Sequence, residues 1–80
     1  MDISVLSNEK RLRLLLCLEK PHSVSQLLEK CNLSQSALSQ HLTKLKRAGF
    51  VNCSRHGNRQ IYTTKNKKII KVAKSIIELI

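Results

Sequence analysis

The hydrophobic positions of the chain first cluster between Ser7 and Pro21. Ser7 or Asn8 is a suitable helix N-cap, and Glu9 then lies in the first turn. Pro21 prevents the helix from continuing, so we expect it to end at about Glu19. Its apolar residues surround most of the circumference, which is typical of a central helix packed on more than one side. They are Leu12, Leu14, Leu15, Leu16, Cys17 and Leu18.

A helix-turn-helix pattern follows this first helix. Residues 23–26, Ser-Val-Ser-Gln, form a capping box, which starts a second helix that extends to about residue 30. Residues 31–33 form a short break. Ser34 is the N-cap of a third helix, and Gly49 ends that helix at its C-terminus.

The third helix has one apolar face and one polar face. At about 100° per residue, Leu38, Leu42 and Leu45 form an apolar stripe. An ordinary surface helix would mix Glu with Lys on its other side, but this polar side contains no acid. A surface that approaches phosphates and base edges has to exclude carboxylates, so this face suits a DNA major groove. The polar side consists of Ser36, Ser39, Gln40, Thr43 and Arg47.

Beyond Gly49 the pattern changes to two predicted strands, residues 50–55 and residues 60–64. Gly57 and Asn58 are typical of a hairpin turn. The bases near the predicted tip of this hairpin are Arg55, His56 and Arg59.

The last predicted helix begins after Asn66 and extends to Ile80. Its apolar residues cover about half of the circumference, more than one small core usually covers. A second copy of the chain is therefore expected to cover part of them. They are Ile69, Ile70, Val72, Ala73, Ile76, Ile77, Leu79 and Ile80.

The charge is concentrated in the second half of the chain. The 80 residues have a net charge of +10, and residues 41–80 alone contain ten bases and one acid. Such a basic region indicates a polyanionic partner, with nucleic acid favoured over an anionic membrane or a merely solvated face. Phe50 and Tyr62 are the only aromatic residues, which argues against single-strand binders that stack bases on aromatic side chains.

Other protein classes fit the sequence less well. No nucleophile–base signature indicates an enzyme, and no apolar segment approaches the roughly 20 residues of a membrane span. The N-terminus lacks the apolar segment of a secretory signal, so a cytoplasmic location is expected. A basic amphipathic helix over residues 65–80 would suit a membrane surface, but that function would not explain the helix-turn-helix or the hairpin.

Together these elements predict a mainly α-helical fold with a small β-hairpin, a winged helix-turn-helix. The sequence resembles the ArsR/SmtB family of bacterial winged-helix repressors at residues 8–15, 33–51 and 55–62. The resemblance implies a homodimer, built from the N- and C-terminal helices, that binds double-stranded DNA at an inverted repeat. In one domain of residues 1–80, we expect the helix-turn-helix at about 23–48, the wing at about 50–64 and the dimerisation helix at about 66–80. A DNA-binding protein with an architectural or plasmid-maintenance role is the alternative.

The same resemblance implies roles for individual residues. The family's recognition helix corresponds to about residues 35–48, and the wing corresponds to the predicted hairpin. His41 lies at the edge of the apolar stripe, so a partly buried, hydrogen-bonded structural histidine is as plausible there as a DNA contact. The residues expected near bases are Gln35, Ser36, Ser39 and Gln40; those expected near the DNA backbone are His41, Thr43, Lys44, Arg47, Arg55, His56 and Arg59.

The family resemblance also bears on sensing. One metal site of the family uses a Cys-Val-Cys-Asp-Leu motif, where this chain has Ser-Val-Ser-Gln-Leu at residues 23–27. Because hydroxyls are poor ligands for soft metals, no metal and no cofactor are expected. Cys17 falls where the sulfur- and redox-sensing branch keeps a reactive cysteine, but residues 66–80 lack the partner cysteine of that branch. We therefore expect Cys17, Cys31 and Cys53 to be free thiols, with no reason for any two of them to lie close together.

Overall fold

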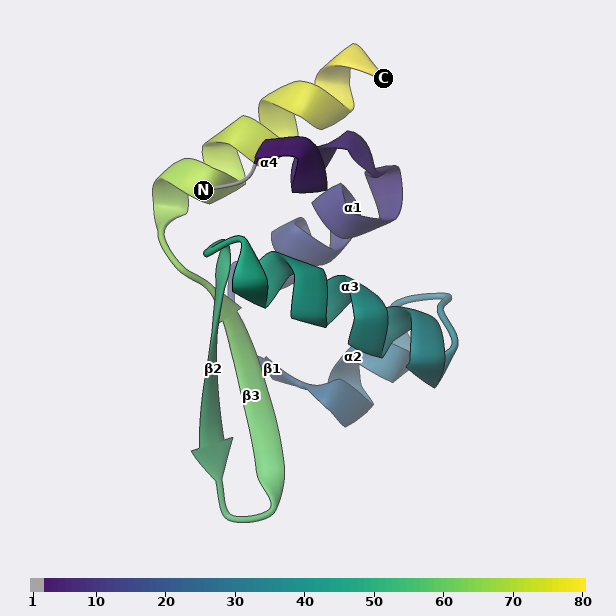
Figure 1. Cartoon of the computed structure of the whole chain (residues 1–80), viewed down its shortest axis with the longest axis vertical. Coiled ribbons are helices and arrows are strands. Elements are labelled where there is room, and N and C mark those ends of the chain that lie inside the picture. The colour runs from purple at the N-terminus through teal and green to yellow at the C-terminus, as the bar shows by residue number, and fades with distance from the viewer. Residues whose placement is uncertain (1–2) are drawn as a thin grey trace.

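The computed structural model describes residues 3–80, which form a winged helix-turn-helix (Figure 1). The strands β2 and β3 form the wing, and α2 and α3 form the helix-turn-helix. The elements in chain order are the 3-10 helix η1 (Ile3–Ser7), α1 (Glu9–Cys17), β1 (His22–Ser23), α2 (Val24–Lys30), α3 (Gln35–Arg47), β2 (Val51–His56), β3 (Arg59–Thr64) and α4 (Lys67–Leu79).

Side-chain caps start all four α-helices, as the sequence predicts. Each cap oxygen accepts a hydrogen bond from the backbone N–H three residues later, at 3.1–3.2 Å. At α2 the capping box is complete, because the Gln26 side chain accepts from the Ser23 N–H at 2.8 Å. The caps are Asn8, Ser23, Ser34 and Asn66.

The C-terminus of α3 also follows the prediction. Gly49 adopts a φ of 83°, a left-handed conformation that favours glycine. Its N–H bonds to the Lys46 carbonyl, and the Phe50 N–H bonds to the Leu45 carbonyl, which is the Schellman pattern. The helix therefore ends sharply and Phe50 enters the core.

The first helix is shorter than predicted, because it ends at Cys17 rather than at about Glu19. Its last carbonyl groups accept from the N–H groups of Leu18 and Glu19, which close the final turn. The Leu18 carbonyl also accepts from the Thr64 N–H at 2.8 Å, and the Leu15 carbonyl also accepts from the Thr64 hydroxyl at 3.0 Å. The end of α1 is thus bonded to β3, a strand distant in sequence.

The sheet has three antiparallel strands in the order β1-β3-β2, one strand more than predicted. β1 consists of His22 and Ser23, which pair with Tyr62 and Ile61 of β3. The predicted two-residue turn is confirmed, since His56 pairs with Arg59 across it. Gly57 has a φ of 65° at the first turn position, as a type II′ turn requires.

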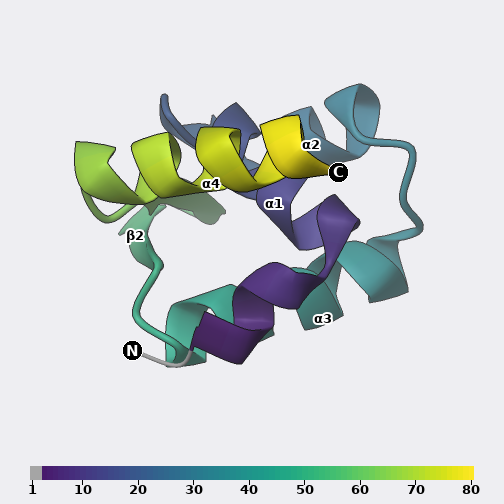
Figure 2. The same ribbon diagram turned by 90° about the horizontal axis from the view of Figure 1, so that it is seen from above.

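A leucine-rich core joins the helices. α1 lies between α3 and α4, and α4 packs along it (Figure 2). The fully buried large side chains come from α1, α2 and α3, with Leu18 between α1 and β1. They are Leu12, Leu14, Leu15, Leu18, Leu27, Leu38 and Leu45. Among the described residues, no helix is long and apolar enough to cross a membrane.

Candidate nucleic-acid interface

The predicted polar face of α3 is on the surface. Leu38, Leu42 and Leu45 are buried, and the opposite side is open to solvent. The Thr43 hydroxyl donates to the Ser39 carbonyl at 2.8 Å, so its hydrogen is engaged within the helix. The exposed residues of α3 that the sequence places near DNA are Gln35, Ser36, Ser39, Gln40, Thr43, Lys44 and Arg47.

His41 lies apart from this face, half-buried beside α1. Its Nδ1 atom is buried and has no hydrogen-bond partner among the described residues. The expected hydrogen bond of a structural histidine is therefore absent at this nitrogen. Burial lowers the pKa of His41, and the charges of Arg11, Lys44 and Lys10 lower it further.

The three bases of the wing are exposed near the hairpin turn, where His56 pairs with Arg59. The His56 Nε2 atom lies 3.2 Å from the Ser54 hydroxyl. The Arg59 guanidinium donates to the Ser23 hydroxyl at 3.0 Å, and Ser23, Arg55 and Arg59 line one pocket. The N-terminus of α2 therefore lies beside the tip of the wing, which the sequence did not indicate.

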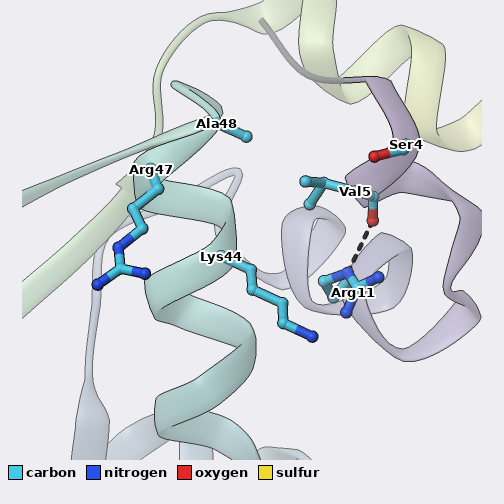
Figure 3. Close-up of a pocket in the computed structure, with 6 residues that line it drawn as sticks. All are labelled: Ser4, Val5, Arg11, Lys44, Arg47 and Ala48. Carbon is cyan, nitrogen blue, oxygen red and sulfur yellow. Dashed lines mark hydrogen bonds between the residues drawn. The ribbon is translucent and has the colours of Figure 1, made fainter.

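A basic pocket of about 390 Å³ lies between the C-terminal half of α3 and the N-terminal elements η1 and α1 (Figure 3). Within residues 3–80, its lining contains three cationic side chains and no carboxylate. Sequence reasoning missed Arg11, since nothing in the leucine-rich pattern of α1 relates it to α3. The lining residues are Ser4, Val5, Arg11, Lys44, Arg47 and Ala48.

The cations of α3 and the wing are not neutralised by nearby acids. Arg13 and Glu9, 3.4 Å apart on the exposed side of α1, form the one ion pair within residues 3–80. The basic residues of α3 and the wing therefore present an uncompensated positive surface, which favours a polyanion.

Two of the cysteines lie close together, which the predicted layout offered no reason to expect. Cys17 at the end of α1 and Cys31 at the C-cap of α2 line one pocket of about 600 Å³. Burial, together with the neighbouring Cys17 thiol, raises the pKa of Cys31, and Lys30 partly opposes this effect. Cys53 instead pairs with Tyr62 across β2 and β3, and burial together with the Cys53 thiol raises the pKa of Tyr62.

Within the described part of the chain, no three His, Cys, Asp or Glu side chains converge in a group that could hold a metal ion. Ser23 and Ser25 occupy the two thiolate positions of the family's metal motif, but their surroundings differ from each other. Ser23 is buried as the cap of α2, and Ser25 is exposed.

Comparison with known proteins gives relatives that share both sequence and fold. Residues 6–54 match the family described as helix-turn-helix domain. The transcriptional activator HlyU of Vibrio cholerae is 38% identical over 79 residues, which are 98% of this chain and 69% of HlyU. The structure of reduced HlyU from Vibrio cholerae superposes with a TM-score of 0.82 at 35% identity, over 96% of this chain and 82% of that chain.

Two further proteins extend the comparison. The nodulation protein NolR of Rhizobium meliloti is 35% identical over 78 residues, 96% of this chain but only 64% of NolR, so this chain spans less than two thirds of that relative. A Mycobacterium bovis fragment, described as a homodimeric winged helix-turn-helix DNA-binding domain, superposes with a TM-score of 0.81 over 95% of this chain and 71% of that chain. At 23% identity, it shows a shared fold.

Proposed function

Because this chain belongs to the ArsR-type helix-turn-helix family of DNA-binding transcription regulators, we propose that it acts as a homodimeric repressor at an imperfect inverted repeat. The observation that carries the proposal is the exposed, acid-free face of α3, which is capped at both ends and backed by buried leucines. As in its relatives, this is a regulator and not an enzyme. We expect it in the cytoplasm, where the DNA of a bacterial cell lies.

The dimer is supported by the unpartnered apolar face of α4. Leu79, Ile80 and Val72 are 87%, 70% and 47% exposed in a single chain. Clustered large apolar side chains at this exposure mark an association surface. We propose that a second copy of the chain covers them, since a symmetric inverted repeat requires a two-fold symmetric protein. The two α3 helices then enter successive major grooves, about 34 Å apart.

We assign different roles to the residues of the interface. Gln35, Ser36, Ser39 and Gln40 lie on the N-terminal half of α3, the part of a recognition helix that contacts base edges. The remaining predicted residues are basic or lie near the groove walls, where phosphate contacts orient the protein without reading sequence. Those on the exposed surface are Thr43, Lys44, Arg47, Arg55, His56 and Arg59, whereas His41 is half-buried beside α1 and is left out of the interface. The hydrogen bond from Arg59 to Ser23 would place a phosphate contact of this residue beside the N-terminus of α2.

The first prediction tests base readout. Gln40→Ala should weaken binding to a selected cognate duplex by about 1–3 kcal/mol and leave binding to random duplex nearly unchanged. Fluorescence anisotropy with both duplexes at one salt concentration measures this difference. Gln60→Ala, at an exposed glutamine on β3, is the matched control and should leave the discrimination intact. Equal losses on cognate and random DNA would show that Gln40 does not read bases.

Repression follows from occupancy alone when the operator overlaps a promoter. HlyU is named an activator, so the direction of regulation is tested directly. A promoter reporter carrying the selected site should be repressed when this chain is expressed, and Gln40→Ala should relieve the repression. Increased reporter output would establish activation instead.

Because Ser23 and Ser25 replace thiolates, we expect zinc, cadmium and arsenite to leave the repression unchanged.

A further inference from the structure

The basic pocket between α3 and the N-terminal elements lies directly beside the proposed base-reading face. At about 100° per residue, Gln40, Lys44 and Arg47 fall within one quadrant of α3. Lys44 extends from this quadrant towards Arg11 of α1, and Arg47 leaves α3 on its outer side (Figure 3). The pocket is therefore continuous with the surface that would enter the major groove.

The cations of the pocket are oriented but not neutralised. The Arg11 Nε–H donates to the Val5 carbonyl at 2.7 Å, which ties α1 to η1 and fixes the plane of the guanidinium. Among residues 3–80, no carboxylate lines the pocket and none of its three cations takes part in an ion pair. The depressed pKa of the neighbouring His41 agrees with a local excess of positive charge. Such a site favours an anion with several acceptor oxygens, and Arg is well suited to bind a phosphate with two hydrogen bonds.

The position of the pocket indicates which phosphate would fill it. A helix in the major groove has one sugar–phosphate backbone on each side. In Figure 1, α2 lies on one side of α3, and η1 with α1 lies on the other. The cap of α2 and the wing face one backbone, so the other backbone would run past Arg11, Lys44 and Arg47.

We propose that this pocket is a phosphate site that holds a backbone phosphodiester of the duplex, on the side of α3 away from α2. The proposal rests on the proposed DNA-binding mode and extends it to α1, a helix outside the helix-turn-helix. Arg11 and Lys44 each donate to the non-bridging oxygens, and Arg47 supplies the outer wall.

The test compares two arginines of the same helix. Arg11→Gln should make the plot of log K against log salt shallower by about one unit, on cognate and random duplex alike. Arg13→Gln is the matched control, because Arg13 lies two residues away, outside the pocket and paired with Glu9. It should leave the slope unchanged. Equal slopes for Arg11→Gln and the wild-type protein would overturn the proposal.

A second variant separates charge from folding. Arg11→Lys keeps the positive charge but loses the Nε–H that bonds to Val5. It should retain the wild-type salt slope, whereas a slope as shallow as that of Arg11→Gln would mean that Arg11 acts only by holding η1. Circular dichroism melting of all three variants provides the measure of folding.

A neutral methylphosphonate, substituted for one backbone phosphate of the duplex at a time, identifies the phosphate that binds in the pocket. One linkage in each half-site should weaken binding by the wild-type protein more than binding by Arg11→Gln, because that variant has already lost one of its contacts to the phosphate. If no linkage behaves in this way, the pocket does not hold a backbone phosphate.

Titration with inorganic phosphate at constant ionic strength, followed by amide chemical shifts, tests whether the pocket instead binds free phosphate. Saturable binding of free phosphate without a salt-slope change for Arg11→Gln would identify a small-anion site and refute the backbone contact.

The Gln40→Ala and Arg11→Gln variants together separate failure of the phosphate site from failure of the proposed DNA-binding function. If Gln40→Ala loses discrimination while Arg11→Gln keeps the wild-type slope, the base-reading face stands and the phosphate site falls. If neither variant changes duplex binding, both assignments fail.

Discussion

Arg59 and Ser23, 36 residues apart in sequence, couple the wing to the first helix of the helix-turn-helix. The buried Ser23 hydroxyl both accepts from the Gln26 N–H and receives the guanidinium of Arg59. A residue assigned from its sequence position to the tip of the wing thus also links the wing to α2. Charged donors form stronger hydrogen bonds than neutral ones, so this contact orients the hairpin relative to α2.

His41 gives a prediction at the same scale. Its folded-state pKa lies below the usual value of 6.5, because burial and the cations Arg11, Lys44 and Lys10 disfavour the imidazolium. As the pH falls below 6.5, the unfolded chain therefore takes up this proton before the folded chain does. The free energy of unfolding should consequently fall with decreasing pH, from about pH 7 until the folded-state pKa is passed.

His41→Gln should flatten this pH dependence, which chemical denaturation at several pH values between about 5 and 8 measures. His56→Gln, at an exposed site on the wing, is the control and should retain the wild-type pH profile. An unchanged profile in His41→Gln would show that another group causes the acid sensitivity.

Among the helices, the C-terminal ends of α1 and α2 lie beside the same pocket. The C-cap Leu18 terminates α1 one residue after Cys17, and Cys31 is itself the C-cap of α2. The two thiols contact each other across the pocket between these helix ends. The turn that leads into α3 therefore begins at a side-chain contact with the central helix.

This contact predicts a disulfide between Cys17 and Cys31 on oxidation with diamide. The two thiols lose two protons and two electrons, which reduce the diazene to a hydrazine. Because the helix ends are already in contact, we expect the bond to form within one chain and DNA binding to survive. Peptide mapping by mass spectrometry identifies the pairing, and Cys53→Ser is the control that should leave it unchanged. A predominant bond through Cys53, or one between chains, would contradict the prediction.

At the scale of the whole molecule, α4 packs one side on α1 and leaves its end exposed. Ile69, Ile70 and Ala73 are buried, whereas Leu79 and Ile80 protrude. The buried part anchors α4 to the core, and the exposed part supplies the surface for a second copy.

Leu79→Glu should therefore yield a folded monomer. Leu79 is 87% exposed in one chain, so the charge does little harm to the monomer but becomes unpaired and buried in the proposed dimer. Light scattering after size exclusion measures the mass, and anisotropy should show the loss of binding to the inverted repeat. Lys74→Glu, on the side of α4 away from Leu79, should remain dimeric. A Leu79→Glu dimer of normal DNA affinity would refute the proposed interface.

The features that depend on near neighbours in the chain could be predicted from the amino-acid order alone. Caps such as Ser34, the Schellman end at Gly49 and the turn at Gly57 involve residues within a few positions of each other, so the local sequence predicts them. The amphipathic period of α3 likewise identifies its buried and exposed sides. The family resemblance, which the comparisons confirm, rests on these same local segments.

Contacts between residues distant in the chain became known only from the three-dimensional fold. Packing between elements determines five features of this kind. They are the short strand β1, the bonds from the end of α1 to β3, the approach of Cys17 to Cys31, the bond from Arg59 to Ser23 and the position of Arg11 beside α3. Local periodicity specifies which face of a helix is apolar, but the depth and rotation at which two helices pack depend on the side chains of both. The positions of side chains at the edges of those faces, including Arg11 and His41, are therefore fixed only when the whole core assembles.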